Sequence, residues 1–570
     1  MNRLIELLFA RRGMSMNDYF EMESLVGGKL AGMDEVLACL HEISQDTSGR
    51  TLVVAPDFDM DGIMSGTVLV AGLSELGFSV ELFVPNPSSG YGLTADEAHR
   101  LLDTHPNVGW VITCDMGISC VDGLSVLHDV GVPAIITDHH KEPVDASKSA
   151  RSIAWATVDP CGVGETYPLP QICGAYVAWL VVRAYADMYG STEVVDRIER
   201  LRVFAGIGTV SDLMPLVHEN RQLVRDAIGL CRLIWANPDP WFVRGLEGGM
   251  AYRRAFDGLA FAIKAFNDEH PFSSPLDVNE KFLGFSFAPT FNAAKRMNVD
   301  MGHAFNVFFG DAQARAMGMS ALMSANAARK ALVKTKLSEI KEQDNPGAPI
   351  VYITDASSGI VGLLASNLQG HSGYPTLVLR ANDDGTYSGS GRSPEWYPFI
   401  DRVAATFGIA ASGHNGAFGV RFDSLQDAMD AAVLIRNDAD QLHAALGIDD
   451  TDMYDLVIDS LGGGDMWYDV GALYEFVSFM DAFAPFGRGW PEPRVLAIAH
   501  DSEYHVSRMG TDGRHLRITL PHGLTFISWN AGDMADDVTG TIELSGVLSL
   551  NEFAGNVSVQ LIGDVEKVRV

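Results

Sequence analysis

The sequence has few cysteines, no long apolar runs and a shortage of basic residues. Its six cysteines form no CxxC pair and no zinc-ligand spacing. Thiols scattered in this way argue against a disulfide framework and a structural zinc site, and they are typical of a cytoplasmic protein. No apolar run approaches the ~18 residues of a membrane-spanning helix, so we expect no membrane association. The apolar patch within residues 1–12 is interrupted by Glu6 and lacks a cleavage site, which indicates a first helix and not a signal peptide.

The shortage of basic residues gives the chain a formal charge of −32, from 41 basic and 73 acidic residues. Taken alone, this charge argues against a passive nucleic-acid binder, because phosphate contacts depend on lysine and arginine. It does not exclude an enzyme with a local basic track and bound metal ions. An acidic solubilising surface explains most of the excess, and a basic partner protein or a salty cytoplasm would also fit. The reason for the charge stays open.

At 570 residues the chain is too long for one hydrophobic core, so we expect several domains. Apolar strands alternate with helical stretches in the first part, which predicts an α/β protein with a doubly wound parallel sheet. A long connecting helix is expected over Ala312–Lys341, and a second α/β unit follows it. The predicted domains are 1–218 (the doubly wound sheet), 219–343 (a helical connector), 344–448 (the second α/β unit) and 449–570 (a small β-barrel).

The pattern in the second half supports this division. Strands are expected at 349–353 and 376–379, with Gly-rich turns at 388–393 and 412–419. Short alternating segments near the C-terminus are typical of a small β-barrel, and we expect a barrel of OB type. They lie at 515–520, 524–529, 540–548 and 557–562.

Four motifs rich in aspartate and histidine carry the chemistry. They are Asp57-Phe58-Asp59-Met60-Asp61, Asp115, Thr137-Asp138-His139-His140 and Asp212. We interpret each as a strand end, and apolar runs at 51–54, 109–112 and 133–136 precede the first three. The carboxyl ends of parallel strands line one crevice, so these groups can share two divalent cations. Oxygen ligands with one imidazole suit Mn²⁺ or Mg²⁺ better than zinc.

Within these motifs we assign roles. The predicted metal ligands are Asp59, Asp61, Asp115, His139 and Asp212, and Asp57 lies behind them. The predicted catalytic residues are Asp115, Asp138, His139 and His140, with His140 free to contact the scissile phosphate. The alternative for any single aspartate is an N-cap at a strand-to-helix junction. Four motifs in order make capping by chance improbable.

The motifs resemble those of the DHH phosphoesterase superfamily, and specifically those of the RecJ single-strand exonucleases, nearly from end to end. Gly90-Tyr91-Gly92-Leu93 matches a turn of that family, and Ala205–Asp212 is similar to its fourth motif. Asn292-Ala293-Ala294-Lys295-Arg296 resembles its Asn-x-x-x-Arg element. The segments 389–393 and 413–417 look like the phosphate-gripping turns of the DHH-associated domain, and the C-terminal domain resembles the RecJ OB domain.

This resemblance implies metal-dependent 5′→3′ degradation of single-stranded DNA to mononucleotides, in DNA repair or recombination. It also implies that Arg296, Ser390 and Arg392 hold the 5′-terminal phosphate, and we add Asn292 and His414 to this group. Two arginines and a turn rich in backbone N–H groups suit a phosphate. The alternatives are a surface ion pair for each arginine, a plain hairpin for the glycines and a buried structural histidine for His414.

The sequence departs from the family pattern at Ala55, Pro87, Ser357 and Trp490. Two other functions remain open: a phosphodiesterase for short oligonucleotides or cyclic dinucleotides, and a non-catalytic scaffold similar to Cdc45. The retained acidic residues argue against the scaffold. The OB-like domain favours long single strands as substrates, because their bases can stack on its aromatic side chains. These are Tyr504, Phe526, Trp529 and Phe553. We expect a monomer that binds single-stranded DNA. A single-strand-binding protein or a helicase is a further candidate partner.

Overall fold

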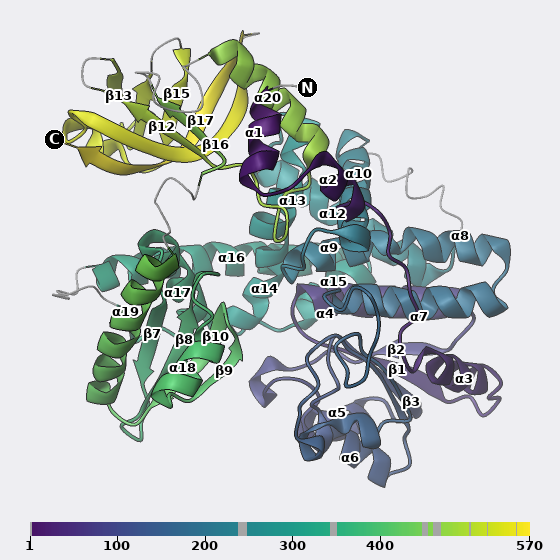
Figure 1. The fold of residues 1–570 in the computed structure, drawn as a ribbon. Coiled ribbons are helices and arrows are strands. Elements are labelled where there is room, and N and C mark those ends of the chain that lie inside the picture. The colour runs from purple at the N-terminus through teal and green to yellow at the C-terminus, as the bar shows by residue number, and fades with distance from the viewer. Residues whose placement is uncertain are drawn as a thin grey trace. The chain divides into compact units, whose positions relative to one another are not determined.

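The computed structural model describes residues 3–237, 248–341, 350–446, 454–459, 469–500, 503–520, 523–553 and 556–569 (Figure 1). By its internal contacts the chain forms two units. The main unit comprises Val26–Met214 and Gln222–Leu446, and the C-terminal unit comprises Met1–Leu25, Pro215–Arg221 and Gly447–Val570. The predicted boundaries at 343/344 and 448/449 lie outside the described residues, so the four-domain division stays a prediction.

The main unit begins with a parallel sheet in the order β2-β1-β3-β4-β5. Its strands are β1 (Thr51–Pro56), β2 (Val80–Leu82), β3 (Val108–Cys114), β4 (Ala134–Thr137) and β5 (Ala156–Val158). β1, β3 and β4 are mainly apolar, and all their residues except Val108 are buried, because parallel strands are covered on both faces. The doubly wound fold predicted from the sequence is confirmed.

Helices cover both faces of this sheet. Alternate side chains such as Val53, Val111 and Ile136 pack with residues of α5 (Ala95–Thr104) and α6 (Val121–Asp129). The strands also contact α3, α4 and α7. These helices span Met33–Ser44, Met60–Glu75 and Gly174–Tyr189, and short turns of 3₁₀ helix lie at Pro87–Ser89, Ala146–Lys148 and Ala150–Ser152.

The interpretation of Asp212 as a strand end is wrong. The residues before it form helix α9 (Arg202–Ser211), which follows α8 (Thr192–Arg200). The two glycines of this segment serve close helix packing, since a Cβ on Gly206 would lie 2.1 Å from the Leu223 carbonyl oxygen. A Cβ on Gly208 would lie 2.3 Å from Asp61 Oδ1. An apolar segment with small residues therefore resembles a buried strand although it is a buried helix.

Helices dominate the segment that follows. They are α10 (His218–Ala236), α12 (Met250–Glu269), α13 (Glu280–Phe282), α14 (Ala288–Arg296), α15 (Gly302–Phe309) and α16 (Ala312–Lys341), with a 3₁₀ turn at Pro275–Asp277 and a π-helical turn at Leu283–Phe287. The long helix has the predicted bounds, and Asp311 Oδ1 accepts the Ala314 N–H at 2.8 Å near its start. Asn326 on α16 donates to Thr290 Oγ1 on α14 at 2.8 Å. No helix in the described part of the chain is long and apolar enough to cross a bilayer.

The second α/β part of the main unit has a sheet in the order β6-β7-β8-β10-β9, in which only the β6–β7 pair is parallel. The strands are β6 (Val351–Ile353), β7 (Thr376–Ala381), β8 (Tyr387–Arg392), β9 (Ala411–His414) and β10 (Ala417–Phe422). Val378 packs with α17 (Ser358–Ser372), whereas Leu377 and Leu379 pack with α18 and α19. These two helices span Phe399–Phe407 and Leu425–Leu446 (Figure 1).

The Gly-rich turns expected at 388–393 and 412–419 are mainly strands, β8, β9 and β10. Their glycines allow close approach between neighbours, because a Cβ on Gly389 would lie 1.9 Å from the Val378 carbonyl oxygen. A Cβ on Gly391 would lie 2.1 Å from the Phe418 ring. Glycine in a strand often marks such an approach and not a turn.

The C-terminal unit contains a sheet in the order β11-β12-β16-β17-β15-β14-β13. The strands are β11 (Leu456–Asp459), β12 (Val495–Ala499), β13 (His505–Met509), β14 (His515–Thr519), β15 (Thr525–Ser528), β16 (Thr541–Phe553) and β17 (Asn556–Arg569). The helices are α1 (Arg3–Arg11), α2 (Met16–Met22) and α20 (Val470–Phe483), and Gly532–Asp536 forms a 3₁₀ turn. The expected strands are present, and β16 and β17 are longer than predicted.

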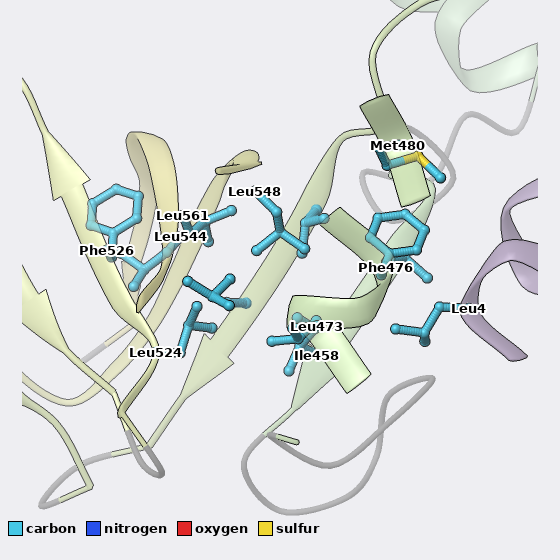
Figure 2. Packing of buried hydrophobic residues seen from close by; sticks show 14 of the residues in the cluster. Leu4, Ile458, Leu473, Phe476, Met480, Leu524, Phe526, Leu544, Leu548 and Leu561 are labelled. Atoms are coloured by element: carbon cyan, nitrogen blue, oxygen red, sulfur yellow. The ribbon is translucent and has the colours of Figure 1, made fainter. Parts of the chain in front are cut away.

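The N-terminal helices belong to the core of this C-terminal unit. Figure 2 shows Leu4 of α1 near Leu473 and Phe476 of α20, in a cluster that extends to Phe526 and Leu544 of the sheet. Arg221 also connects the N-terminal helices to the later part of this unit. It is 1% exposed and donates to the Pro485 carbonyl at 2.7 Å and to the Tyr19 hydroxyl of α2 at 3.0 Å. The sequence prediction had placed residues 1–25 with the doubly wound sheet.

Candidate active site

Three of the four motifs lie at neighbouring strand ends of the first sheet. Asp57, Asp115 and Asp138 follow β1, β3 and β4, and each is at most 3% exposed. These strands are adjacent in the sheet, so their carboxyl ends bring the three motifs together. Asp212 joins them from the C-terminal end of α9, since its Oδ2 lies 3.7 Å from His139 Nε2.

Asp59 and Asp61 stand at the start of α4. Asp59 is the N-cap, and its Oδ1 accepts the N–H groups of Asp61 and Gly62 at 3.0 and 3.2 Å. Both hydrogen bonds fall on Oδ1, which leaves Oδ2 for another ligand. Asp61 accepts the N–H groups of Gly174 and Ala175 at 2.7 and 3.1 Å, at the first turn of α7. The N-terminus of α4 therefore fixes the orientation of the Asp59 carboxylate, and the N-terminus of α7 stabilises the negative charge of Asp61.

Asp115 is the central carboxylate of the cluster. Its backbone has φ of 60°, a conformation that aspartate tolerates better than most residues, and its Oδ1 lies 2.9 Å from His139 Nε2. The backbone of Gly174 lies directly against it, because a Cβ there would be 2.6 Å from Asp115 Cβ. His139 Nε2 also lies 3.8 Å from Asp61 Oδ2. One imidazole nitrogen thus faces three carboxylates.

The electrostatics of the cluster suit a bound cation. Burial, followed by the charges of Asp61 and Asp59, raises the pKa of Asp115 well above its usual range. Burial and Asp59 raise the pKa of Asp57 to about 8, and its Oδ1 has no hydrogen-bond partner among the described residues. Carboxyl groups that raise one another's pKa are neutralised by a divalent ion.

The donor atoms fall into groups of metal-binding size. Ligand atoms within 4.8 Å of one another occur in the sets Asp57–Asp59–Asp115, Asp61–His139–Asp212 and Asp115–His139–His140. Burial lowers the pKa of His139, which favours the neutral imidazole that a metal ligand requires. The residues present therefore fit two hard divalent ions, and their individual ligand roles stay predictions.

His140 points to a different part of the site from His139. Its Nδ1 lies 2.8 Å from Asp138 Oδ1, and its Nε2 lies 3.2 Å from the Tyr91 hydroxyl. Burial alone would lower its pKa, but Asp138, Asp212 and Asp57 raise the pKa of His140 to about 9. Asp138 also accepts the Ile118 N–H at 2.9 Å. The predicted catalytic Asp138 thus orients His140 and lies in none of the ligand sets.

A cavity of about 560 Å³ adjoins the cluster, and most of the predicted phosphate-binding residues line it. Asn292, Arg296, Ser390 and Arg392 share its wall with Asp59. Asn292 Oδ1 accepts the Met60 N–H at 2.8 Å, so this side chain ties α14 to the start of α4. Arg392 donates to Ser366 Oγ at 3.0 Å and forms no ion pair in the described part of the chain.

The start of α17 completes this cavity, a feature that the sequence analysis missed. Ser357, Ser358, Gly359 and Gly362 line it, and Ser357 is an N-cap without a side-chain capping bond. Free N–H groups at a helix N-terminus bind anions readily. The signal was a Ser-Ser-Gly run between the strand at 351–353 and an apolar helical stretch.

His414 lies apart from the other phosphate-binding candidates. It is exposed, so the buried structural alternative is wrong, and it lines a second cavity of about 750 Å³. Tyr91, His140 and Lys141 line the same cavity. Tyr91 is a residue that the prediction omitted from the site, although it stands in the quoted Gly-Tyr-Gly turn.

The four departures from the family pattern have different surroundings. Pro87 and Ser357 line the first cavity, whereas Ala55 is buried in the sheet. Trp490 is 1% exposed and donates to the Phe483 carbonyl at 3.0 Å within the C-terminal unit.

The aromatic candidates of the C-terminal unit also separate. Phe526 is fully buried, and the Tyr504 hydroxyl donates to the Gly540 carbonyl at 2.8 Å. Trp529 is 55% exposed and lies beside His515, with ring centroids 4.8 Å apart. Of the three candidates whose burial is described, Trp529 offers an open face.

Comparison with known proteins agrees with this fold. Residues 51–205 match the DHH family, N-terminal domain, and residues 471–564 match the RecJ OB domain. The chain is 26% identical to the single-stranded-DNA-specific exonuclease RecJ of Salmonella typhimurium, over 98% of this chain and 95% of that protein. It is 26% identical to RecJ of Thermus thermophilus, over 93% of this chain and 70% of that protein.

A crystal structure of T. thermophilus RecJ in complex with Mn²⁺ has the same fold. The TM-score is 0.69 at 22% identity, and the match covers 99% of this chain and 76% of that chain. The match to the DHH family covers residues 51–205, and the resemblance of the chain to RecJ proteins is confirmed over nearly its whole length.

Proposed function

We propose that this protein is a metal-dependent exonuclease that degrades single-stranded DNA from the 5′ end to mononucleotides. The supporting observation is that Asp59 belongs both to the acidic cluster and to the wall of the cavity that Arg296 and Arg392 line. A terminal phosphate bound by these arginines would bring the next phosphodiester to the cluster, so each cleavage would release one nucleotide. The similarity to proteins named single-stranded-DNA-specific exonuclease supports the choice of substrate.

In this proposal the acidic cluster holds two Mn²⁺ or Mg²⁺ ions. The ligands are Asp59, Asp61, Asp115, His139 and Asp212, and Asp57 lies behind them. When bound, such ions activate a water and stabilise charge on the phosphate and the leaving oxygen. The chain itself fixes the ligand geometry in advance, because α7 amides hold Asp61 and the Gly174 backbone packs against Asp115.

His140 has a separate role, which is to hold a proton at Nε2. Asp138 accepts from Nδ1 and stabilises the imidazolium, and the pKa of His140 is about 9. At neutral pH the ring is therefore charged and can donate to a non-bridging oxygen of the scissile phosphate. In the absence of substrate, the Tyr91 hydroxyl, 3.2 Å from Nε2, accepts a hydrogen bond from this N–H group.

The test is digestion of 5′-phosphorylated single-stranded DNA with Mn²⁺, with the label at either end of the strand. We expect wild type to release mononucleotides from the 5′ end and Asp115→Ala to release none. Asp129→Ala, which changes an exposed aspartate of the same sheet domain, is the matched control and should retain activity. Intact long DNA together with cleaved dinucleotides would move the assignment to a short-substrate phosphodiesterase. If neither long DNA nor dinucleotides were cleaved, the result would favour the non-catalytic scaffold.

The cellular setting forms part of the same proposal. We propose a monomer that acts in the cytoplasm in DNA repair or recombination, and a single-strand-binding protein or a helicase would supply the strand. The six cysteines are all unpaired with one another, which fits a reducing compartment.

A further inference from the structure

Lys295 lines the cavity of about 560 Å³ beside the acidic cluster, and the proposed mechanism has not used it. It lies in the last turn of α14, directly before Arg296, and its side chain is exposed. Together with Arg296 and Arg392 it lines the cavity that also contains Asp59. The ammonium group is therefore available to a ligand in this cavity.

The phenyl ring of Phe58 holds the Lys295 side chain in place. Lys295 Nζ lies 3.7 Å from the centroid of that ring, and Phe58 is buried between Asp57 and Asp59 in the sequence. A cation over an aromatic face is attracted by the ring but keeps its own N–H donors. The ammonium is thus oriented on the side of the cavity that faces the acidic cluster.

In the described part of the chain, no hydrogen bond or ion pair of the Lys295 ammonium is found. By contrast, Lys336 on α16 lies 2.7 Å from Glu339 and 2.6 Å from Asp355. Lys295 feels the charges of Asp57 and Asp59, but it forms no direct ion pair with either of them among the described residues. It therefore differs from a lysine on a solvated helix face, which pairs directly with a neighbouring acid.

The charge balance of the cavity calls for an anion. Its described lining carries three cationic side chains and one carboxylate, and that carboxylate is Asp59. This local excess of positive charge stands in a chain whose formal charge is −32. Arginine binds phosphate through its planar fork, and lysine adds a compact point charge.

We propose that Lys295 is a specificity-determining residue that binds the 5′-terminal phosphate together with Arg296 and Arg392. This inference rests on the proposed function and deepens it, because it makes strand binding depend on a 5′-phosphate. In this arrangement, Arg296 of α14 and Arg392 of β8 supply two of the three cations. Lys295, which lies over the Phe58 ring, supplies the third cation on the side of the phosphate nearest the acidic cluster.

The experiment measures binding of 3′-labelled single-stranded DNA with either a 5′-phosphate or a 5′-hydroxyl, by fluorescence anisotropy in EDTA. Asp115→Asn serves as the parent protein, so that cleavage does not interfere. We expect Lys295→Met to weaken binding of the phosphorylated strand by about 10- to 100-fold, the range of a hydrogen bond between charged groups. Binding of the hydroxyl strand should change much less, and Lys295→Arg should keep a preference for phosphate.

Two controls make the result specific. Lys330→Met removes an exposed lysine of α16 outside the cavity lining and should leave the ratio of the two affinities unchanged. The salt dependence of binding to the phosphorylated strand should also weaken in Lys295→Met, by about 0.7 in the logarithmic slope.

Equal losses on both strands, no loss, or a parent protein without preference for the phosphorylated strand would overturn the role of Lys295. Release of mononucleotides by wild type tests the exonuclease assignment separately. The two proposals can therefore fail independently.

Discussion

Asp159 gives a prediction about stability that can be worked from the structure. It follows β5, is 2% exposed, and its Oδ1 accepts the Cys161 N–H at 2.8 Å. Its Oδ2 has no hydrogen-bond partner among the described residues. Burial, followed by the charge of Asp138, raises the pKa of Asp159 from 3.8 to about 7. The folded protein therefore keeps a proton on this carboxyl that the unfolded chain loses.

The consequence is a free energy of unfolding that falls as the pH rises from about 4 to about 7, because the unfolded state binds fewer protons in this range. A difference of about three pKa units corresponds to about 4 kcal/mol. About 2.5 kcal/mol of this loss occurs between about pH 5 and about pH 8. Asp159→Asn keeps the Oδ1 acceptor and carries no charge, so it should remove this dependence.

The assay is the thermal unfolding midpoint of wild type and Asp159→Asn across this pH range, in EDTA. The rise in the midpoint caused by the asparagine should be greater at about pH 8 than at about pH 5, by about 3 °C, because the entropy of unfolding is about 2.1 cal/mol/K per residue and Asp159 belongs to the large main unit. Other titrating groups act on both proteins and cancel in the comparison. Asp129→Asn, at an exposed position, should show no such trend. A midpoint difference that is constant over the range would refute the reasoning.

Three further predictions concern the site and the C-terminal unit. Gly174→Ala places a Cβ 2.6 Å from Asp115 Cβ and should lower nuclease activity about a hundredfold with little change in circular dichroism. Gly229→Ala, where a Cβ meets nothing within 4 Å, is its control. Mn²⁺ binding at about pH 7 should release protons, measured by calorimetry in buffers of different ionisation enthalpy, because the pKa of Asp57 is about 8; no release would contradict the metal site. Trp529→Ala should weaken binding of single-stranded DNA by about 1–3 kcal/mol, and unchanged affinity would assign its exposed ring no part in binding.

The parts of the fold that the sequence predicts are those with local causes. β1, β3 and β4 are continuous apolar runs followed by aspartate, and α16 is an uninterrupted stretch rich in good helix formers. Because parallel strands end at one edge, the same runs also predict that Asp57, Asp115 and Asp138 meet.

The parts that the sequence does not predict depend on distant neighbours. The glycines before Asp212 and in β8 serve close approach to Leu223, Asp61 and Val378, and nothing local names those partners. Asp59 shows a second limit, because the sequence alone offers a helix cap and a metal ligand as alternatives. In the structure its Oδ1 caps α4 and its other oxygen remains, so the two roles are compatible.

The packing of α1 and α2 in the C-terminal unit has a consequence for synthesis of the chain. Leu4, Leu8 and Phe9 are buried only when they meet residues encoded more than 400 positions later. At about 5–20 residues per second, the ribosome needs roughly 20–80 s to make the intervening chain. During that time the amphipathic first helices lack their native neighbours. The nascent chain therefore presents the apolar side chains of α1 and α2 without their native neighbours until the C-terminal strands of this unit have been made.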